Sequence, residues 1–151
     1  MLPSKQAYLA GGTAAALQLG HRLSHDLDFF TDKEFDEEIV GPALEDVGLQ
    51  RMEIDWRTVR GEFDGVSFSY FYYKYPLISD THECEGVAIA DLSDIAAMKI
   101  DAISSRGVRR DFIDLYAIMQ DRHYSLTTVI ELYQKKYGMG RDMVVHALRS
   151  L

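Results

Sequence analysis

Apolar residues in the first 90 positions come in short runs that glycines or charged residues separate. Residues 8–10 form an apolar start, two glycines follow, and the alanine-rich residues 13–19 end at Gly20. This order predicts a strand, a tight turn and a helix. Residues 28–30 predict a second strand, and residues 35–47 predict a charged helix.

Residues 50–73 are rich in aromatic and β-branched side chains and predict further strands. The clearest is residues 66–73, where serines alternate with apolar residues at the start of an aromatic run. That alternation indicates a strand with one face in the core. The segment His82-Glu83-Cys84 contains metal-ligating residue types, but it has no second cluster to complete a zinc site, and we expect an ordinary loop there.

From Asp91 onward the spacing of apolar residues becomes helical. A first helix is expected to begin at a cap residue, Asp91 or Ser93, and to run through Ile103. Residues 105–107 predict a break. Further helices are expected at residues 110–120, from near Ser125 and from near Arg141.

The change of pattern near Ala90 predicts two lobes within one compact domain of residues 1–151. The α/β lobe would be residues 1–90 and the helical lobe residues 91–151, so the predicted fold class is α+β. Of 151 residues, 47% are hydrophobic and 26% are charged, with 11 Gly, 3 Pro and 1 Cys. This composition excludes a collagen-like, disordered or disulfide-rich chain.

The lone Cys84 cannot form an internal disulfide, which favours a reducing, cytoplasmic environment. The chain begins without a signal-like segment and contains no apolar run of membrane-spanning length, so we expect no membrane association. The formal net charge of -8 repels nucleic-acid backbones and attracts divalent cations. We therefore expect no extended DNA binding.

Two glycines and a pair of aspartates form the first candidate site. Gly11 and Gly12 lie between the first predicted strand and helix, where a backbone without side chains lets a phosphate approach the amides at the helix start. Asp26 and Asp28 are two residues apart on the second predicted strand, so both carboxylates would point to one face. Separately, these features are also typical of a plain turn and a solvated strand end.

In this order and spacing, the two features favour a metal and phosphate site. Two adjacent carboxylates repel each other unless a cation lies between them. Magnesium is the expected ion, with manganese as the alternative, because it takes oxygen ligands and bridges to substrate phosphates. A nucleoside triphosphate would be the matching substrate.

Residues 8–30 read Tyr-Leu-Ala-Gly-Gly-Thr-Ala-Ala-Ala-Leu-Gln-Leu-Gly-His-Arg-Leu-Ser-His-Asp-Leu-Asp-Phe-Phe. They resemble the signature of the nucleotidyltransferase AbiEii/AbiGii toxin family, within the polymerase-β-like nucleotidyltransferase superfamily. Residues 91–116, with Ala-Met-Lys-Ile-Asp-Ala-Ile and Arg-Gly-Val-Arg-Arg-Asp-Phe-Ile-Asp-Leu-Tyr, resemble that family's second conserved stretch. The two stretches cover about a third of the chain.

The resemblance implies a polymerase-β-like core, in which a mixed sheet has flanking helices, followed by a helical lobe. It implies that Gly12 and Thr13 hold nucleotide phosphates and that Asp26 and Asp28 hold the metal. Lys99, with Asp111 or Asp114, would complete the site from the helical lobe.

Lys99 is unusual even without the resemblance. It falls at the centre of an apolar helical arc, while Asp94 and Asp101 fall on the opposite side. A buried lysine needs an anion or a polar cleft. One alternative is a buried ion pair with Asp111 or Asp114. The other is an open site, and we expect the open site, in which case Lys99→Met would cost little stability.

Arg106, Arg109 and Arg110 surround Gly107 and form a basic cluster in an acidic chain. Guanidinium groups suit triphosphate oxygens or an RNA backbone, although a solvated turn between helices has the same composition. Arg22 and Ser24, just before the aspartate pair, are candidate phosphate contacts or turn residues.

One feature departs from the superfamily. Polymerase-β-like enzymes commonly carry a third carboxylate on a later strand, whereas residues 66–73 offer Ser67 and Ser69 and no acid. Asp111 or Asp114 would then supply that charge, or the site holds one metal, or catalysis is lost.

The functional hypothesis is a magnesium-dependent nucleotidyltransferase that acts as the toxin of a toxin–antitoxin system. It would transfer a nucleoside monophosphate to a hydroxyl of RNA, with tRNA as one candidate, or of protein, and it would have a cognate antitoxin. The alternatives are a degenerate fold that binds nucleotide or a partner without catalysis, and a phosphohydrolase.

Overall fold

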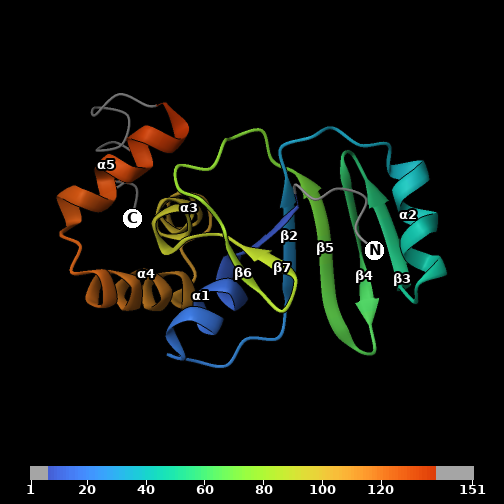
Figure 1. Cartoon of the computed structure of the whole chain (residues 1–151), viewed down its shortest axis with the longest axis horizontal. Helices are drawn as coiled ribbons and strands as arrows, with labels where there is room; N and C mark the ends of the chain where they lie inside the picture. The colour runs from blue at the N-terminus through green and yellow to red at the C-terminus, as the bar shows by residue number, and fades with distance from the viewer. Residues whose placement is uncertain (1–6, 139–151) are drawn as a thin grey trace.

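The computed structural model describes residues 7–138 (Figure 1). The strands are β1 (Tyr8–Ala10), β2 (Leu27–Thr31), β3 (Gln50–Asp55), β4 (Thr58–Phe63), β5 (Val66–Tyr72), β6 (His82–Cys84) and β7 (Val87–Ile89). The helices are α1 (Gly11–Leu19), α2 (Glu37–Asp46), α3 (Leu92–Ser105), α4 (Arg109–Arg122) and α5 (Leu126–Tyr137). This arrangement confirms the predicted α+β class.

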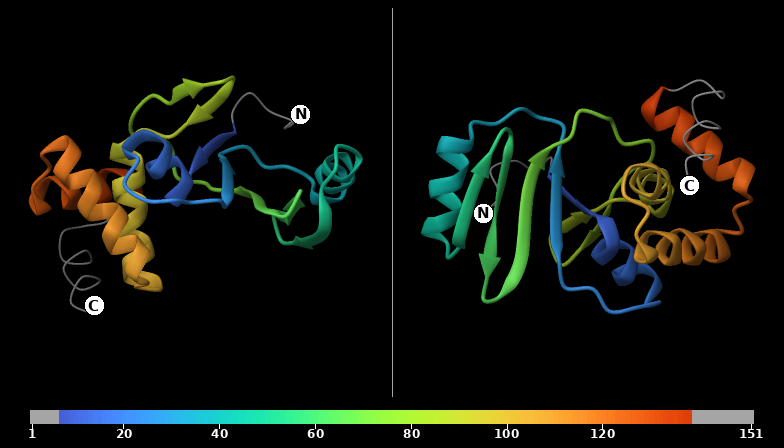
Figure 2. Two further views of the ribbon diagram at one scale, coloured as in Figure 1. Left: turned by 90° about the horizontal axis from the view of Figure 1, so that it is seen from below. Right: turned by 180° about the vertical axis from the view of Figure 1, so that it is seen from behind.

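The strands form one mixed sheet in the order β3-β4-β5-β2-β1-β7-β6. β2 pairs parallel with β5 and antiparallel with β1, while β4 joins β3 and β5 in an antiparallel hairpin series. In Figure 1, α2 lies at the β3 end of the sheet, and α1 and α3 to α5 gather beyond the other end; Figure 2 shows the same separation from below and behind. The central strands of the sheet therefore lie between α2 and the group formed by the other helices.

The register places a polar row across the middle of the sheet. Arg60 of β4 lies opposite Ser69 of β5, Ser69 lies opposite Asp28 of β2, and Asp28 lies opposite Ala10 of β1. Residues that are directly opposite on neighbouring strands point to the same face. Asp28, Ser69 and Arg60 therefore share one face of the sheet.

The other face of β4 and β5 is the core. Val59, Phe68 and Tyr70 are buried there, and Phe35 contacts the ring of Tyr70. Buried Val40 and Leu44 mark the inward side of α2, which contacts β3 and β4. The alternation that predicted β5 thus places its serines on the polar face of the sheet, and it places Phe68 and Tyr70 on the face that packs against α2.

The C-terminal helices are fixed by buried charges. Asp91 caps α3 by accepting a hydrogen bond from the Ser93 amide at 3.0 Å, as the sequence predicted. Asp94 is fully buried, where the helical arc had predicted an outward position, because it accepts hydrogen bonds from the amides of Ile78 and Ser79 and from Lys136 Nζ at 2.7 Å. This pair ties α3 to α5 and to the segment that follows β5.

Most predicted elements are confirmed within a few residues, but the structure differs at α1, at β6 and at β7, a strand that the sequence did not predict. The helix α1 starts at Gly11, directly after β1, so the glycine pair forms the first turn of the helix and not a separate turn. His82–Cys84 is a strand, β6, which pairs with β7, where we had predicted a loop. The helix predicted near Arg141 lies outside the described residues. Within residues 7–138, no helix is long and apolar enough to cross a membrane.

Lys136→Met should destabilise the protein by about 3–5 kcal/mol, because it leaves the buried Asp94 carboxylate without its cation. The neighbouring Lys135 is exposed and provides a matched control, since Lys135→Met removes the same charge without touching Asp94. Urea unfolding of both variants measures the difference. Equal stability of the two variants would contradict a structural role for this pair.

Candidate active site

Two adjoining cavities lie on the polar face of the sheet and share Gly11, Asp28, Lys99 and Arg106. We call the first the phosphate cavity. It has a volume of about 280 Å³, and its lining also includes Gly12, Thr13, Arg22, Leu23, Ser24, His25, Asp26 and Arg110. We call the second the aromatic cavity. It has a volume of about 370 Å³, and its lining also includes Phe30, Arg60, Ser69, Phe71, Tyr73, Ile95, Met98, Asp101, Ala102 and Ser105.

The aspartate pair lies where the two cavities meet. Asp26 directly precedes β2 and is exposed, whereas Asp28 is in the strand and partly buried. Burial raises the pKa of Asp28, and the neighbouring charge of Asp26 raises it further, although Lys99, Arg106 and Arg110 act in the opposite direction. The effect of Asp26 on the pKa of Asp28 has the sign expected for two neighbouring like charges.

The N-terminus of α1 opens into the phosphate cavity. Its cap residue, Ala10, offers no side-chain hydrogen bond, and Gly11, Gly12 and Thr13 of its first turn line the cavity. Unsatisfied amides and the helix dipole favour an anion at such an end. Gly11 has a φ of +74°, and an added Cβ would lie 3.1 Å from Asp28 Oδ2, so a glycine is needed there.

The structure gives a different reason for a glycine at position 12 from the one that the sequence suggested. A Cβ at Gly12 would lie 2.2 Å from Nη2 of Arg22. The guanidinium of Arg22 is held there by Asp114, with Nε to Oδ1 at 2.6 Å and Nη2 to Oδ2 at 2.8 Å. The absent side chain thus makes room for an arginine that covers the start of α1, and not directly for a phosphate.

Lys99 is the centre of a buried ion cluster. Its Nζ lies 3.0 Å from Asp111 Oδ1 and 2.7 Å from Asp114 Oδ2. Arg106 donates to both oxygens of Asp111, each at 2.8 Å. We call Lys99, Asp111, Asp114, Arg22 and Arg106 the ion cluster.

The ion cluster corrects our expectation for Lys99. Lys99 is 4% exposed, and its ammonium pairs with both aspartates, as in the ion-pair alternative. The Lys99 side chain nevertheless lines both cavities. These contacts contradict the expected open site for the ammonium, and they predict that Lys99→Met loses stability.

The two aspartates of α4 are fully buried, and ion pairs and hydrogen bonds lower the pKa of each. Burial alone would raise the pKa of Asp111, but hydrogen bonds from Arg106 and Lys99 outweigh it and hold that pKa below its usual value. Burial is likewise outweighed at Asp114, where Arg22, Lys99 and His21 hold the pKa well below its usual value. Neither residue lines either cavity, so both act by holding cations beside the site.

Some of the remaining predicted residues line the phosphate cavity, and others hold neighbouring parts of the chain in place. Arg106 and Arg110 line the phosphate cavity, whereas Arg109 does not. Thr13 and Ser24 line it too, but the hydroxyl of Thr13 is 2.7 Å from that of Ser24 and also donates to the carbonyl of Asp26. These two side chains therefore brace the segment that leads into the aspartate pair.

Sequence reasoning missed several residues of the site. His21 Nε2 lies 2.7 Å from Asp114 Oδ1, a contact over 93 positions that no local pattern indicates. Arg60 and Asp101 line the aromatic cavity, and only the strand register and the packing of α3 bring them there. The aromatic rings of Phe30 and Tyr73 also line this cavity, and their centroids are 5.3 Å apart.

The donor set fits a magnesium ion. Within the described residues no group of three or more His, Cys, Asp or Glu side chains could enclose a metal. Asp26 and Asp28 provide two carboxylates beside a cavity with cationic walls. Magnesium is usually bound by one or two carboxylates together with substrate phosphates and water, so an incomplete protein cage agrees with it.

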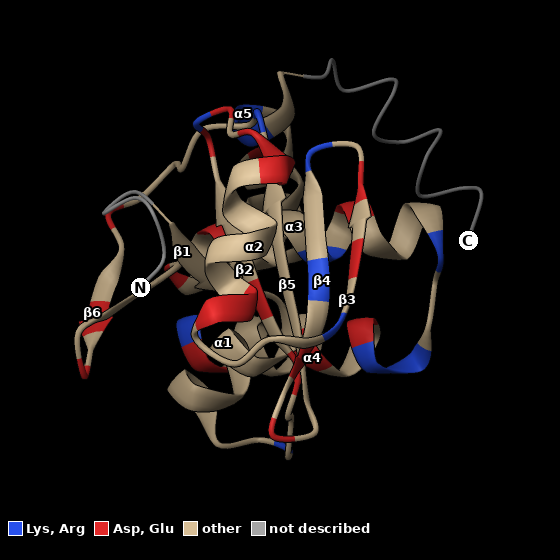
Figure 3. Ribbon diagram, turned by 90° about the vertical axis from the view of Figure 1, so that its right-hand side faces the viewer, with Lys and Arg blue, Asp and Glu red and all other residues tan. Residues whose placement is uncertain are grey.

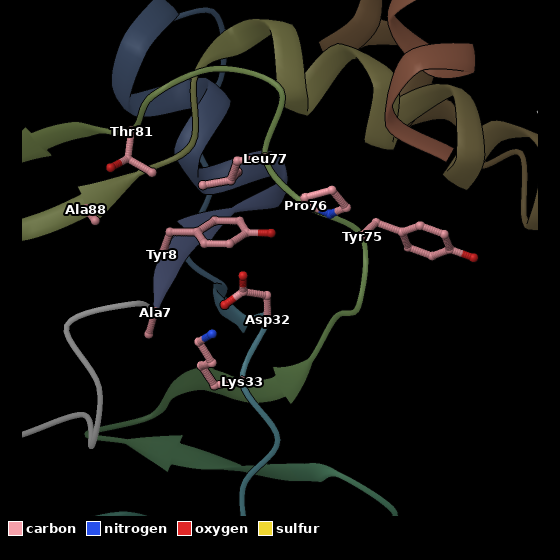
Figure 4. Close-up of a pocket in the computed structure, with 9 residues that line it drawn as sticks. All are labelled: Ala7, Tyr8, Asp32, Lys33, Tyr75, Pro76, Leu77, Thr81 and Ala88. Carbon is pink, nitrogen blue, oxygen red and sulfur yellow. The ribbon is translucent and has the colours of Figure 1, made fainter. Parts of the chain in front are cut away.

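Another cavity, of about 450 Å³, lies beside the end of β2 and contains none of the predicted site residues (Figure 4). Its charged groups are Asp32 and Lys33, and it has neither a glycine pair nor a helix start. The buried hydroxyl of Tyr8 has no hydrogen-bond partner among the described residues, and burial raises the pKa of Tyr8, so it stays neutral. This cavity lacks the charges that a triphosphate needs.

Comparison with solved structures identifies the fold. The antibiotic-resistance factor ANT(2'')-Ia superposes with a TM-score of 0.64 at 13% identity, over 95% of this chain and 86% of that one. JHP933 from Helicobacter pylori gives 0.58 at 20% identity, over 97% and 82%. The Megavirus polyadenylate synthase gives 0.56 at 12% identity, over 78% and 28%. The chain thus has the polymerase-β-like nucleotidyltransferase fold.

Sequence comparison adds one relative. An uncharacterised protein of Aquifex aeolicus, aq_aa25, is 38% identical over 135 residues, which cover 86% of this chain. The match spans 66% of the length of that protein. No family model matches the sequence.

Gly12→Ala should destabilise the protein by about 1–3 kcal/mol, because the methyl group displaces Arg22 and leaves part of Asp114 without its partner. In an Arg22→Ala background the same substitution should cost almost nothing. Urea unfolding of the two single variants and the double variant forms a cycle that isolates this coupling. Costs that simply add would show that Gly12 and Arg22 do not interact.

Proposed function

We propose that this chain is a magnesium-dependent nucleotidyltransferase that transfers a nucleoside monophosphate from a triphosphate to a hydroxyl group. The observation that carries the proposal is the position of Asp26 and Asp28, which lie next to an open helix N-terminus and cationic side chains in one cavity. The nucleotidyltransferase fold supports it. A plain phosphohydrolase would share the metal site but would release phosphate without an acceptor.

The triphosphate would lie in the phosphate cavity. Its negative oxygens would meet the amides at the start of α1 and the side chains of Arg22, Arg106 and Arg110. Arg22 and Arg106 are held in place by Asp114 and Asp111, so they need little reorganisation when the substrate binds. Preorganised charge of this kind stabilises the transition state of phosphoryl transfer.

Asp26 and Asp28 would hold the magnesium ion, which when bound neutralises phosphate charge and polarises the α-phosphate. The acceptor hydroxyl oxygen would attack the α-phosphorus in line with the leaving group. The bond from the α-phosphorus to the bridging oxygen breaks, pyrophosphate leaves, and the hydroxyl proton passes to water in the cleft. The chain contributes position and charge, and forms no covalent intermediate.

The finer assignment rests on the resemblance of residues 8–30 and 91–116 to the AbiEii/AbiGii toxin family. It makes this chain the toxin of a toxin–antitoxin system, acting in the cytoplasm on RNA, with tRNA as one candidate, or on protein, and inhibited by a cognate antitoxin. The division into an α/β lobe of residues 1–90 and a helical lobe of residues 91–151 belongs to the same proposal.

One observation favours a second candidate, a degenerate fold that binds nucleotide without transfer. The residue opposite Asp28 on β5 is Ser69, so this position has no acid where polymerase-β-like enzymes commonly carry a third carboxylate on a later strand. Asp111 and Asp114 do not replace it, because their oxygens are occupied by cations. Such a protein would bind a triphosphate with magnesium and release no pyrophosphate in the presence of acceptor RNA.

Asp26→Asn and Asp28→Asn should each lower transfer by about a thousandfold, since each removes a metal ligand that provides several kcal/mol of transition-state stabilisation. The fold should be equally stable or more stable, because like charges no longer repel. Transfer from labelled triphosphates to total RNA, together with thermal melts with and without magnesium, measures both effects.

Asp32→Asn is the matched control, because Asp32 follows the same strand but lines the other cavity. It should keep wild-type transfer. In wild type, magnesium with a triphosphate at a hundred times the dissociation constant should add about 2.7 kcal/mol of stability. A wild-type protein without any such rise would refute the metal site.

A further inference from the structure

Arg60 occupies a distinctive place in the cleft. It is the third residue along the row that starts at Asp28 and passes through Ser69, and all three line the aromatic cavity. Neighbouring strands are about 4.8 Å apart, so the backbone of Arg60 is about 10 Å from that of Asp28. An arginine side chain is long enough to cover much of that distance along the cavity wall.

The guanidinium of Arg60 has no ion-pair or hydrogen-bond partner among the described residues. Its cross-strand neighbour on β3 is Glu53, which together with Asp55 and Arg60 lines a further cavity of about 370 Å³, yet no ion pair joins Arg60 to either carboxylate in the part of the chain that the structure describes. In Figure 3 the blue part of β4 lies beside the red parts of β3, and Arg60 is the only Lys or Arg of that strand. By contrast, Arg22 and Arg106 are bound to buried aspartates. Among the described residues, Arg60 is thus a cation without an ionic partner on the wall of the aromatic cavity.

The position next to Arg60 is the one where the charge of the site departs from the superfamily. Ser69 lies directly opposite Asp28 on β5, where a third carboxylate would add negative charge. Here a neutral hydroxyl and then a guanidinium occupy that side of the cleft. The electrostatic potential on this side is therefore more positive than a third carboxylate would make it.

We propose that Arg60 is a specificity residue for the acceptor, and that it binds a phosphodiester next to the attacking hydroxyl. This inference rests on the proposed transferase function. The acceptor is then the hydroxyl end of a single-stranded polynucleotide, with its terminal sugar near Asp28 and Ser69 and its preceding phosphate at Arg60. A planar guanidinium can bind two phosphate oxygens at once, which a hydroxyl or an amine of the acceptor cannot match.

The net charge of the chain explains why one arginine would matter. With a formal charge of -8, the molecule as a whole repels a polynucleotide, so binding depends on local cations. The rings of Phe30, Phe71 and Tyr73 in the same cavity offer surfaces on which the terminal base can stack. A cationic amino sugar would be repelled by Arg60, and a neutral peptide would gain less from it than a phosphodiester does.

The experiment measures binding and transfer separately. A short fluorescent oligoribonucleotide with a free 3′-hydroxyl is titrated with protein in the presence of magnesium and a non-hydrolysable triphosphate. The same oligonucleotide is then used as acceptor with hydrolysable triphosphates, beside kanamycin and a serine-containing peptide. Variants are Arg60→Ala, Arg60→Lys and Arg60→Glu, with Arg51→Ala as control, because Arg51 is exposed on β3 and lines no cavity described above.

We expect Arg60→Ala to weaken oligonucleotide binding and raise the KM for it by about 10- to 100-fold, the usual effect of losing a charge-assisted hydrogen bond. Arg60→Glu should be worse, Arg60→Lys should restore part of the affinity, and Arg51→Ala should match wild type. The slope of log affinity against log salt should fall by about 0.7 in Arg60→Ala, as for one lost phosphate contact with a single strand. Triphosphate affinity should not change.

Three results would overturn the inference. They are oligonucleotide binding by Arg60→Ala equal to wild type, loss of triphosphate affinity in Arg60→Ala, and a wild-type preference for kanamycin or peptide over the oligonucleotide. The proposed function fails separately, if Asp28→Asn retains full transfer. If Asp28→Asn is inactive but Arg60→Ala binds the oligonucleotide as wild type does, only the role of Arg60 is rejected.

Discussion

A single buried ammonium, that of Lys99, holds together the parts of this molecule on which the site depends. It comes from α3 and lies between two fully buried aspartates of α4, which in turn hold Arg106 at the end of α3 and Arg22 between α1 and β2. Without Lys99, two carboxylates in a low-dielectric interior would repel each other. The cluster therefore fixes α3 to α4, and α4 to the segment that enters β2, before any substrate binds.

The same constraint shapes the cleft. Because Asp114 places Arg22 over the start of α1, position 12 has no room for a side chain. Because Asp111 places Arg106 at the boundary of the two cavities, a cation faces Asp28 from the helical side. The sheet register then supplies the other side of the cleft, with Asp28, Ser69 and Arg60 in one row. Helix packing thus shapes the phosphate cavity, and strand pairing shapes the aromatic cavity.

The sequence predicted the local parts of this arrangement well. Periodicity and cap residues placed β2, β5, α3 and α4, and the two-residue spacing placed Asp26 and Asp28 on one cavity. It did not predict which cation meets which anion, because Arg22 and Asp114 are 92 positions apart and their contact depends on how α1 and α4 pack. Lys99 is instructive, since the apolar arc around it correctly indicated burial, yet only the structure shows that both aspartates, and not an open site, neutralise it.

The most direct test of this account is the equilibrium unfolding of Lys99→Met in urea, measured together with triphosphate binding in magnesium. The account predicts a loss of about 3–5 kcal/mol, the usual cost of leaving buried charges without their partner, and weaker triphosphate binding because Arg22 and Arg106 lose their fixed anchors. A variant as stable as wild type, or more stable, would contradict it, since the aspartates would then not need Lys99 and the ion cluster could not be what builds the cleft.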